Sequence, residues 1–514
     1  MAWWKILLIG LAVLVLGGVG VAWYIMNFVE LDMYVPLYTQ NCAGCHGNEM
    51  QGTDRGVALL GGPLSRGDSV DQLQVSIRQA HPALGNPAFA GALTDIQVKG
   101  LSIYIGERRL GQRFTDFRFD HELVIPDDLQ VSEKHSFRIV DVATGLDPMV
   151  FSIEPLPDGS MLLTEKERGL SIVSAAGVQS ELIEGTPEMG SSVDIMGIQY
   201  GSGWLLDVAI HPQYEENGWV YLHYTHLCGE ACGASMLSAT MNRLDRGRIR
   251  DGQWVDVQTI WQSPMEFYSP TPDTGAGGRI AFDDSGHVYI SLGIKSTDGG
   301  SDTTAQDLRL PYGKILRLRD DGTIPLDNPY FIAAQEGRVA ASAVTPAIWS
   351  YGHRSPQGLE WHPERGTVWD SEMGPRGGDE LNELLPGRNY GWPYVSAGLE
   401  YSGYVVERHK PKAIEFDDTV VEYSLVDITP SPAISSFAFY TGEQFPNWRN
   451  DVLIGSLKGS SLFRMTFQDR ELIEQETLIK DLARIRDVEV GYDGLVYLLL
   501  ENEAGSAIVK LVPG

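Results

Sequence analysis

A strand–turn–strand pattern recurs six times in the C-terminal part of the chain. Each unit has an apolar run, a turn containing Pro, Asp or Gly, and a second apolar run. The units begin at Phe151, Leu206, Arg279, Gly358, Ser436 and Val488. Evenly repeated units of this kind predict a six-bladed β-propeller. A two-sheet sandwich is the alternative, but it would not account for the number and evenness of the repeats.

Composition agrees with a folded, mainly β chain of more than one domain. The chain has 514 residues, of which 43% are hydrophobic, with 57 glycines and 27 prolines. This length exceeds one ordinary domain, and the glycines and prolines favour many turns. The formal net charge is −29, which argues against a nucleic-acid partner because phosphates would be repelled. The charge suits a soluble outer domain or a basic redox partner, without choosing between them.

The segment Cys42-Ala-Gly-Cys45-His46 carries the second strong signal. Two cysteines separated by two residues and followed at once by His are typical of covalent c-type haem attachment. Each Cys adds across a haem vinyl group, and His46 becomes the proximal iron ligand. A bare C-x-x-C would also fit a zinc or thiol redox site. The adjacent His favours haem c and therefore electron transfer.

Residues 31–115 are predicted to form a small all-α haem domain that resembles class I cytochromes c. We expect one helix from Leu37 to His46 and another that begins after the N-cap Thr94. Such modules usually present a distal Met. No Met occurs between Met50 and Met149, and Met50 is too close to His46 to reach the other haem face. The sixth position stays open between His81, Asn86, water and no ligand, and His81 is equally well explained as a surface residue.

The N-terminus contains an uncharged stretch from Ile6 to Met26. At about 1.5 Å per residue it is long enough to cross a hydrocarbon core. Lys5 precedes it and acidic residues follow, so residues 1–30 are predicted to be a single-pass anchor in the inner membrane, with the other domains in the periplasm. A cleaved signal peptide is the alternative, but no convincing cleavage site follows the apolar run.

The chain has four cysteines, and two remain after haem attachment. Cys228 and Cys232 are predicted to form a small disulfide, which an oxidising compartment would permit. A metal site with His226 is less well supported because one His does not complete a tetrahedral set. We place a linker at 116–140 and the propeller at 141–514.

The predicted inter-blade loops resemble those of the glucose/sorbosone dehydrogenase family, and within it the aldose sugar dehydrogenases that use pyrroloquinoline quinone (PQQ). The matching motifs follow one another in order along the chain. They are Leu205-Leu-Asp-Val-Ala-Ile-His-Pro, Gly277-Gly-Arg, Thr304-Ala-Gln-Asp-Leu, Gly313-Lys-Ile-Leu-Arg, Trp349-Ser-Tyr-Gly-His-Arg-Ser-Pro-Gln-Gly, Gly374-Pro-Arg-Gly-Gly-Asp-Glu, Asn389-Tyr-Gly-Trp-Pro, Gly455-Ser-Leu-Lys-Gly and Arg484-Ile-Arg-Asp.

The resemblance implies a cofactor site. PQQ is a flat tricarboxylate, so its pocket needs cations with directional donors. The residues at the family's cofactor positions are Arg354, Lys458, Arg484 and Arg486. Arg484 and Arg486 are two apart on a predicted strand and therefore share a face. The carbonyls of Gly374 and Pro375 would hold Ca²⁺, which prefers oxygen ligands.

The substrate side departs from the family. Gly275 stands where the family has a His that acts as general base, and Ser202 replaces a Gln. An acidic residue is also missing near Ile294, and the loop from Lys295 to Thr303 is longer. The catalytic residue is therefore unknown. Asp273 is a weak candidate, since a carboxylate in a polar loop is usually only solvated.

These observations together predict a membrane-anchored periplasmic quinohaemoprotein. It would oxidise a sugar or another alcohol with PQQ and Ca²⁺ and pass electrons to the fused haem c. A downstream cytochrome or oxidase would accept them. The alternative is a catalytically silent propeller that binds a glycan or a partner, with the haem as electron carrier or sensor. The missing His and Met favour this alternative, whereas the four retained cations oppose it.

Overall fold

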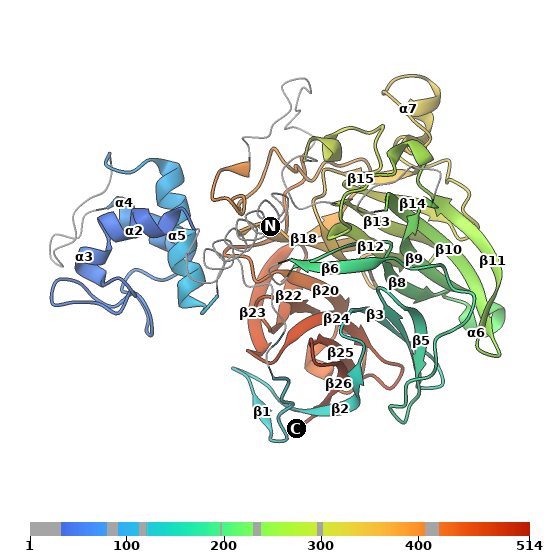
Figure 1. The fold of residues 1–514 in the computed structure, drawn as a ribbon, viewed down its shortest axis with the longest axis horizontal. Coiled ribbons are helices and arrows are strands. Elements are labelled where there is room, and N and C mark those ends of the chain that lie inside the picture. Colours follow the sequence, from blue (N-terminus) through green and yellow to red (C-terminus); the bar gives the residue numbers. More distant parts are fainter. Residues whose placement is uncertain are drawn as a thin grey trace, which may run out of the picture. The chain divides into compact units, whose positions relative to one another are not determined.

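The computed structural model describes residues 32–79, 91–112, 120, 122–195, 198–229, 238–295, 302–406 and 421–514. The chain divides into two compact units (Figure 1). One comprises Met1–Arg113 with Tyr401–Tyr404, and the other comprises Phe114–Glu400 with Val405–Gly514. The predicted anchor, residues 1–30, lies outside the described residues. Among the residues that are described, no helix is both long and apolar enough to cross a membrane.

The first unit is helical, as predicted for a cytochrome c domain. The helices described in it are α2 (Tyr34–Asn41), α3 (Ala43–His46), α4 (Val70–Arg78) and α5 (Asp95–Arg109). The single helix expected from Leu37 to His46 is divided at Cys42, which ends α2 and begins α3. The predicted N-cap Thr94 is confirmed. Its side chain accepts from the N–H of Gln97, whose own side chain bonds back in a capping box.

Helix α2 packs against α5 through its tyrosines. Tyr34 and Tyr38 are both buried, and the ring of Tyr38 lies 5.9 Å from that of Tyr104. Gly100 is required on α5 because a Cβ there would collide with the Tyr34 ring. The Tyr38 hydroxyl donates to the carbonyl of Gly47 at 2.9 Å, which ties α2 to the segment directly after His46.

The second unit is a six-bladed β-propeller, which confirms the prediction from the repeats. Its first strands contact one another in sequence order, and the ring closes where β24 meets β3. The first blade contains β3 (Val150–Pro155), β4 (Met161–Glu165) and β5 (Gly169–Val173), and the second contains β8 (Leu205–Ile210), β9 (Val220–Leu227), β10 (Thr240–Arg250) and β11 (Gln253–Gln262). The third contains β12 (Gly275–Phe282), β13 (His287–Lys295), β14 (Lys314–Arg319) and β15 (Ile348–Tyr351), and the fourth contains β16 (Pro356–His362), β17 (Thr367–Glu372), β18 (Asp379–Leu384) and β19 (Val426–Ile428). The fifth contains β20 (Ile434–Phe439), β21 (Val452–Ser456), β22 (Leu462–Gln468) and β23 (Glu471–Ile479).

The last blade joins strands from both ends of the propeller sequence. It contains β24 (Arg484–Val490), β25 (Val496–Glu501) and β26 (Ser506–Pro513), followed by β2 (Ser136–Leu146) and β1 (Gln130–Val131). Strand β2 pairs antiparallel with β26, and Ile139 lies opposite Leu511. The segment predicted as a linker, 116–140, therefore contains β1 and the start of β2. No repeat marks these strands in the sequence because their partner lies at the other end of the chain.

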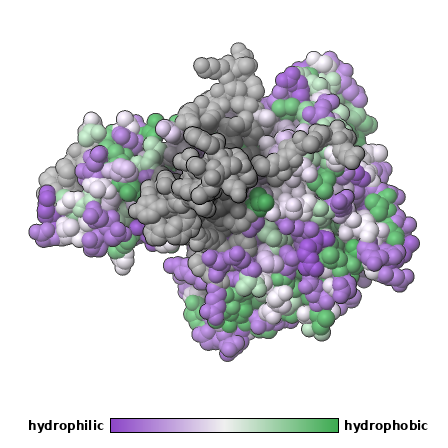
Figure 2. All heavy atoms as spheres, in the orientation of Figure 1, coloured by the Kyte–Doolittle hydropathy of each residue, from purple (hydrophilic) through white to green (hydrophobic). Residues whose placement is uncertain are grey.

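Short elements lie between the strands, both within blades and between them. They are the hairpin β6 (Ser191–Ile195) and β7 (Ile198–Ser202), the helices α6 (Tyr214–Asn217) and α7 (Phe331–Gln335), and the 3₁₀ turns Met265–Phe267, Asp302–Gln306, Thr345–Ala347 and Pro446–Trp448. The apolar core lies between adjacent blades, where strands such as β25 are buried along their whole length. Figure 2 shows hydrophobic residues scattered among hydrophilic ones on the described surface that it draws.

Candidate functional site

Strand direction gathers the predicted cofactor residues at one end of the propeller. Neighbouring strands in a blade are antiparallel. The start of each first strand therefore lies beside the end of the second strand. Arg354 comes just before β16 and Arg484 opens β24, whereas Gly374 follows β17 and Lys458 follows β21. The antiparallel order thus brings together residues that are far apart in the sequence.

Arg484 and Arg486 meet at a buried carboxylate. Nε of Arg484 lies 3.1 Å from Oε2 of Glu501, and Nε of Arg486 lies 2.7 Å from Oε1. The ammonium of Lys166 completes the cluster at 3.3 Å from Oε1. Burial opposes ionisation of Glu501, but Arg486, Lys166 and Arg484 outweigh it and hold the pKa of Glu501 well below its usual range. Burial lowers the pKa of Lys166 to about 8. Lys166, Arg484 and Arg486 therefore share the carboxylate of Glu501.

Arg279, from the Gly-Gly-Arg motif, joins several blades near the propeller axis. Its Nη1 lies 2.8 Å from Asp487 on β24 and 3.2 Å from Asp207 on β8. Its Nε donates to the carbonyl of Gln357 on β16 at 2.7 Å. Because its partners lie on other blades, Arg279 fixes the first strands relative to one another. It acts here as a structural residue.

Arg354 lies beside the Gly374 turn. Its Nη1 donates to the carbonyl of Met373 at 2.7 Å, and its guanidinium lies 5.2 Å from the Trp392 ring centroid. The main-chain N–H of Arg354 donates to Glu372 at 2.6 Å. The guanidinium is therefore held next to the turn that was predicted to bind Ca²⁺.

Behind Arg354 lies a buried cluster of His353, Asp370 and Glu372. Nδ1 of His353 is 2.6 Å from Glu372 and 3.4 Å from Asp370. Burial and the neighbouring Glu372 raise the pKa of Asp370 well above its ordinary value. The three groups could hold a metal ion by composition. In the structure they fix the backbone from which Arg354 extends.

The Gly374 turn is held by Asp379. One carboxylate oxygen accepts from the N–H of Gly374 at 2.9 Å, and the other accepts from the N–H of Ile434 at 2.9 Å. Burial raises the pKa of Asp379 to about 6, and the charge of Lys458 opposes this rise. A Cβ at Gly374 would collide with the carbonyl oxygens of Gly377 and Gly378. This crowding of main-chain oxygens fits the ligand preference of Ca²⁺.

The substrate side is built around a buried ion pair. Asp273 and Lys295 lie 3.1 Å apart with almost no exposed surface. The carboxylate of Asp273 also accepts from the N–H of Gly203 at 2.8 Å and from the Thr240 hydroxyl at 2.9 Å. Both oxygens already have protein partners, so the geometry does not favour Asp273 as a proton acceptor. Gly275 lies two residues after Asp273 and pairs with Lys295, where β12 begins and β13 ends.

The haem-attachment motif has the geometry that an iron ligand needs. Nδ1 of His46 lies 2.7 Å from the carbonyl of Val57. A ring N–H that donates to a carbonyl fixes the tautomer and leaves Nε2 for the metal. Met50 is buried in the core of the unit. His81 and Asn86, the two predicted sixth ligands, lie outside the described residues. In the propeller, Cys228 is disulfide-bonded, while its predicted partner Cys232 lies outside the described residues.

Comparison with known proteins agrees with both units. The model for the family "Glucose / Sorbosone dehydrogenase" matches residues 147–510. The chain belongs to this family. The model for "Cytochrome C oxidase, cbb3-type, subunit III" matches residues 34–105, so a cytochrome c domain precedes the dehydrogenase-like propeller.

Relatives of the propeller are well covered by the chain. The aldose sugar dehydrogenase YliI of Escherichia coli is 32% identical over 367 residues, which is 70% of this chain and 88% of that protein. The crystal structure of the soluble aldose sugar dehydrogenase from Escherichia coli in the apo-form matches with a TM-score of 0.62 and 31% identity, covering 74% of this chain and 100% of that one. Quinoprotein glucose dehydrogenase B of Acinetobacter calcoaceticus is 24% identical over 418 residues, covering 68% and 82%.

The sequence interpretation missed three residues that shape this family member's site. They are Lys166, Asp379 and Glu501. Glu501 had a signal, because it ends the otherwise apolar run Val496-Tyr-Leu-Leu-Leu, and a carboxylate so placed needs a cation. Asp379 lies within the Gly374-Pro-Arg-Gly-Gly-Asp-Glu motif but was given no role of its own. Lys166 carried no signal, since a charged residue directly after a strand is usually solvated.

Proposed function

We propose that the protein is a quinohaemoprotein that oxidises a sugar or another alcohol at PQQ and Ca²⁺ and passes the electrons to a haem c in its own N-terminal domain. The position of Arg354, Lys458, Arg484 and Arg486 at the same end of the propeller as the Gly374 turn carries this proposal. Several Arg and Lys side chains with directional donors suit a flat polyanion. Family membership and the attached cytochrome c domain support the same conclusion.

Different residues would bind the two ligands, PQQ and Ca²⁺. The four basic side chains would bind the carboxylates and carbonyls of PQQ, and the main-chain oxygens of Gly374 and Pro375 would hold Ca²⁺. When bound, PQQ accepts the two electrons of alcohol oxidation, while Ca²⁺ polarises its quinone oxygen. Asp379 keeps the turn in shape, and Glu501 orients Arg484 and Arg486. Trp204 and Phe151 border Lys166 on the same end of the propeller and would exclude water.

The haem domain gives the electrons a path to other proteins. Cys42 and Cys45 would attach the haem, and His46 would ligate its iron. Fusion makes delivery from the propeller intramolecular, at high effective concentration. We place the protein in the periplasm, held to the inner membrane by residues 1–30, with a downstream cytochrome or oxidase as acceptor. No nucleic-acid partner is part of this proposal.

A silent propeller remains the second candidate, and the substrate side favours it. Gly275 has no side chain to act as a base, and Asp273 is committed to Lys295, Thr240 and Gly203. Loss of a general base typically lowers a rate by about 10²–10⁴-fold. In this case the propeller would bind a glycan or a partner, and the haem would serve alone as carrier or sensor.

Reconstitution separates the two candidates. The full-length protein is loaded with PQQ and Ca²⁺, and aldoses and simple alcohols are added while reduction is followed at the haem absorption band. We expect reduction only with both ligands present. Installing a base as Gly275→His should raise the aldose rate, with Gly275→Leu as the control for size. Absence of PQQ binding by the folded protein would establish the silent alternative.

A further inference from the structure

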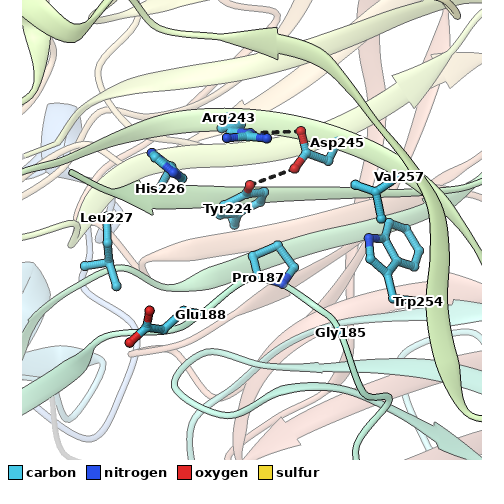
Figure 3. A pocket seen from close by; sticks show the side chains of 10 residues that line it. All are labelled: Gly185, Pro187, Glu188, Tyr224, His226, Leu227, Arg243, Asp245, Trp254 and Val257. Carbon is cyan, nitrogen blue, oxygen red and sulfur yellow. Dashed lines mark hydrogen bonds and ion pairs between the residues drawn. The ribbon is translucent and has the colours of Figure 1, made fainter. Parts of the chain in front are cut away.

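The second blade carries a pocket that the proposed redox chemistry does not use. Its cavity volume is about 290 Å³. Figure 3 shows Tyr224, His226, Arg243 and Asp245 from β9 and β10 on one side, and loop residues on the other. Trp254 closes one end. The volume lies at the lower end of the range for small-molecule sites, about 300–1,000 Å³, so the pocket suits one small ring.

The loop wall of the pocket is pinned at both ends. The N–H of Glu184 donates to the carbonyl of Gly252, and the N–H of Trp254 donates to the carbonyl of Glu184 at 2.7 Å. At the other end, the N–H of Gly190 donates to the carbonyl of Gly203 at 2.6 Å. The wall is therefore preformed, and a ligand would not have to order it.

Two ring N–H groups at the pocket can donate a hydrogen bond to a ligand. Nε1 of Trp254 has no hydrogen-bond partner among the residues that the structure describes, and the residue is only 4% exposed. Nδ1 of His226 lies 2.9 Å from the Tyr268 hydroxyl, which itself accepts from Gln262 at 3.0 Å. The Tyr268 hydroxyl can therefore donate to Nδ1, and in that tautomer of His226 the ring proton lies on Nε2. A buried N–H without a partner is costly, and a ligand oxygen at this wall would recover that cost.

The cation at the pocket, Arg243, is already paired with a carboxylate. Arg243 lies 2.9 Å from Asp245, which also accepts from the Tyr224 hydroxyl at 2.8 Å. Burial and the nearby Arg243 lower the pKa of His226 below its ordinary value, so its ring is neutral at pH 7. The remaining charge is the carboxylate of Glu188, within a chain of net charge −29. An anionic ligand is therefore disfavoured.

We propose that this pocket binds the ring of a neutral sugar. The aromatic rings of Tyr224 and Trp254 would face the C–H surface of the ring. The N–H groups of His226 and Trp254 would donate to hydroxyl oxygens, and Glu188 would accept from hydroxyl groups. This combination of aromatic walls and planar polar groups recognises a polyhydroxylated ring without needing net charge. The pocket does not contain the predicted cofactor residues, so this binding stands apart from the proposed oxidation.

Sugar binding to the pocket can be measured at Trp254 itself. The full-length protein, without added PQQ or Ca²⁺, is labelled with 5-fluorotryptophan, and the resonance of Trp254 is assigned from its loss in Trp254→Phe. Methyl β-glucoside is the neutral probe, and glucuronate is the same ring with a carboxylate. We expect a saturable shift with methyl β-glucoside at a Kd on the order of millimolar, and a markedly weaker response to glucuronate.

Matched variants locate the binding. Val257→Trp fills the pocket at an exposed rim position, whereas Val178→Trp adds the same side chain at an exposed site elsewhere. Both exposed positions should tolerate the change, which circular dichroism checks. Val257→Trp should weaken methyl β-glucoside binding at least about tenfold, and Val178→Trp should leave it unchanged. An unmoved Trp254 resonance, a shift that survives Val257→Trp, or a preference for glucuronate would each overturn the proposal.

Discussion

Lysine ammonium groups are buried at several points of the propeller, and each is held by nearby oxygens. Lys314, from the Gly-Lys-Ile-Leu-Arg motif, has no exposed surface and donates to the carbonyls of Thr304, Ala305 and Tyr312 at 2.6–3.2 Å. Three acceptors satisfy all three N–H groups, but within the described part of the chain no carboxylate contacts the charge. Burial lowers the pKa of Lys314 to about 7, and the distant Asp307 only partly opposes this.

The lowered pKa of Lys314 predicts a pH dependence of stability. Between pH 7 and the ordinary lysine range, the unfolded chain keeps a proton that the folded chain has released. The free energy of unfolding should therefore rise with pH through this window and level off above about pH 10. Denaturant titrations from pH 7 to 10 measure the slope. Lys314→Met should reduce it, whereas Lys480→Met, at an exposed lysine, should not. Equal slopes in wild type and Lys314→Met would contradict the prediction.

Lys458 gives a clean test of the cationic site. It is half-buried, whereas the exposed Lys480 offers a matched control. A hydrogen bond to a charged group contributes about 1.5–3 kcal/mol, so Lys458→Ala should weaken PQQ binding by about one to two decades. Equilibrium dialysis with PQQ measures the change, and Lys480→Ala should bind as the wild type does. Arg484 and Arg486 are less suitable, because their removal would leave Glu501 charged and buried, which lowers stability itself.

At the scale of elements, the closure of the ring is the feature on which the propeller depends. Strand β2 completes the last blade, and Ile139 and Leu511 face each other in one buried cluster. This pairing holds together strands separated by almost the whole propeller sequence. The six repeats could be predicted because each is local, with two apolar runs around one turn. The closing strand could not, because a single run has no neighbour in the sequence to reveal its pairing.

A double-mutant cycle measures this closure. Ile139→Ala and Leu511→Ala should each lower the free energy of unfolding by about 2–5 kcal/mol. Because the two residues are partners, the double variant should depart from additivity by about 0.5–3 kcal/mol. Val140→Ala, on the more exposed face of β2, should change stability by less than about 0.5 kcal/mol. Strict additivity would show that β2 and β26 do not act as one unit.

In the candidate site too, features formed by residues close together in the sequence could be predicted, whereas contacts between distant residues could not. The basic residues and the Gly374 turn could be predicted because motif and chemistry coincide in short segments. Lys166 and Glu501 could not be joined to them, since their 3.3 Å contact links the first blade to the last. Asp273 is a residue type that can act as a base, but its carboxylate is buried against Lys295. Nothing in the sequence around either residue indicates this contact.

The helical unit makes a prediction about its iron ligation. His46 is oriented by Val57, and Met50 is buried and sits four residues from the proximal ligand. We therefore expect covalent haem with a proximal His and no Met ligand. The oxidised protein should lack the near-infrared charge-transfer band of Met-ligated haem, while His46→Ala should lose the normal haem spectrum. A clear Met band would require a different distal side.

At the scale of the whole molecule, the negative charge bears on the electron acceptor. The formal charge of −29 is large for 514 residues. Attraction between opposite charges speeds the encounter of two proteins, and salt weakens this attraction. The Debye length, which sets its range, falls from about 30 Å at 0.01 M salt to about 8 Å at 0.15 M. On the proposed function, a basic soluble cytochrome should therefore be the favoured acceptor.

Ionic strength tests this steering. With the reconstituted protein and excess sugar, the second-order rate of reduction of a basic cytochrome c should fall by at least about tenfold between about 0.01 M and 0.15 M salt. An uncharged dye acceptor should show little change over the same range and serves as the control. If both acceptors respond alike, the salt acts on a step inside the protein and not on the encounter.

The pairing of β2 with β26 also sets an order of events during synthesis. The four helices that the structure describes in the haem unit are complete once residue 109 has been made. The propeller, in contrast, lacks its closing partner until the segment Ser506–Pro513 emerges. Until then β2 lacks the strand with which it pairs, and the ring of blades cannot close. On the proposed function, haem attachment to Cys42 and Cys45 would therefore not require the closed ring, because the helices that carry these residues do not include the closing strand.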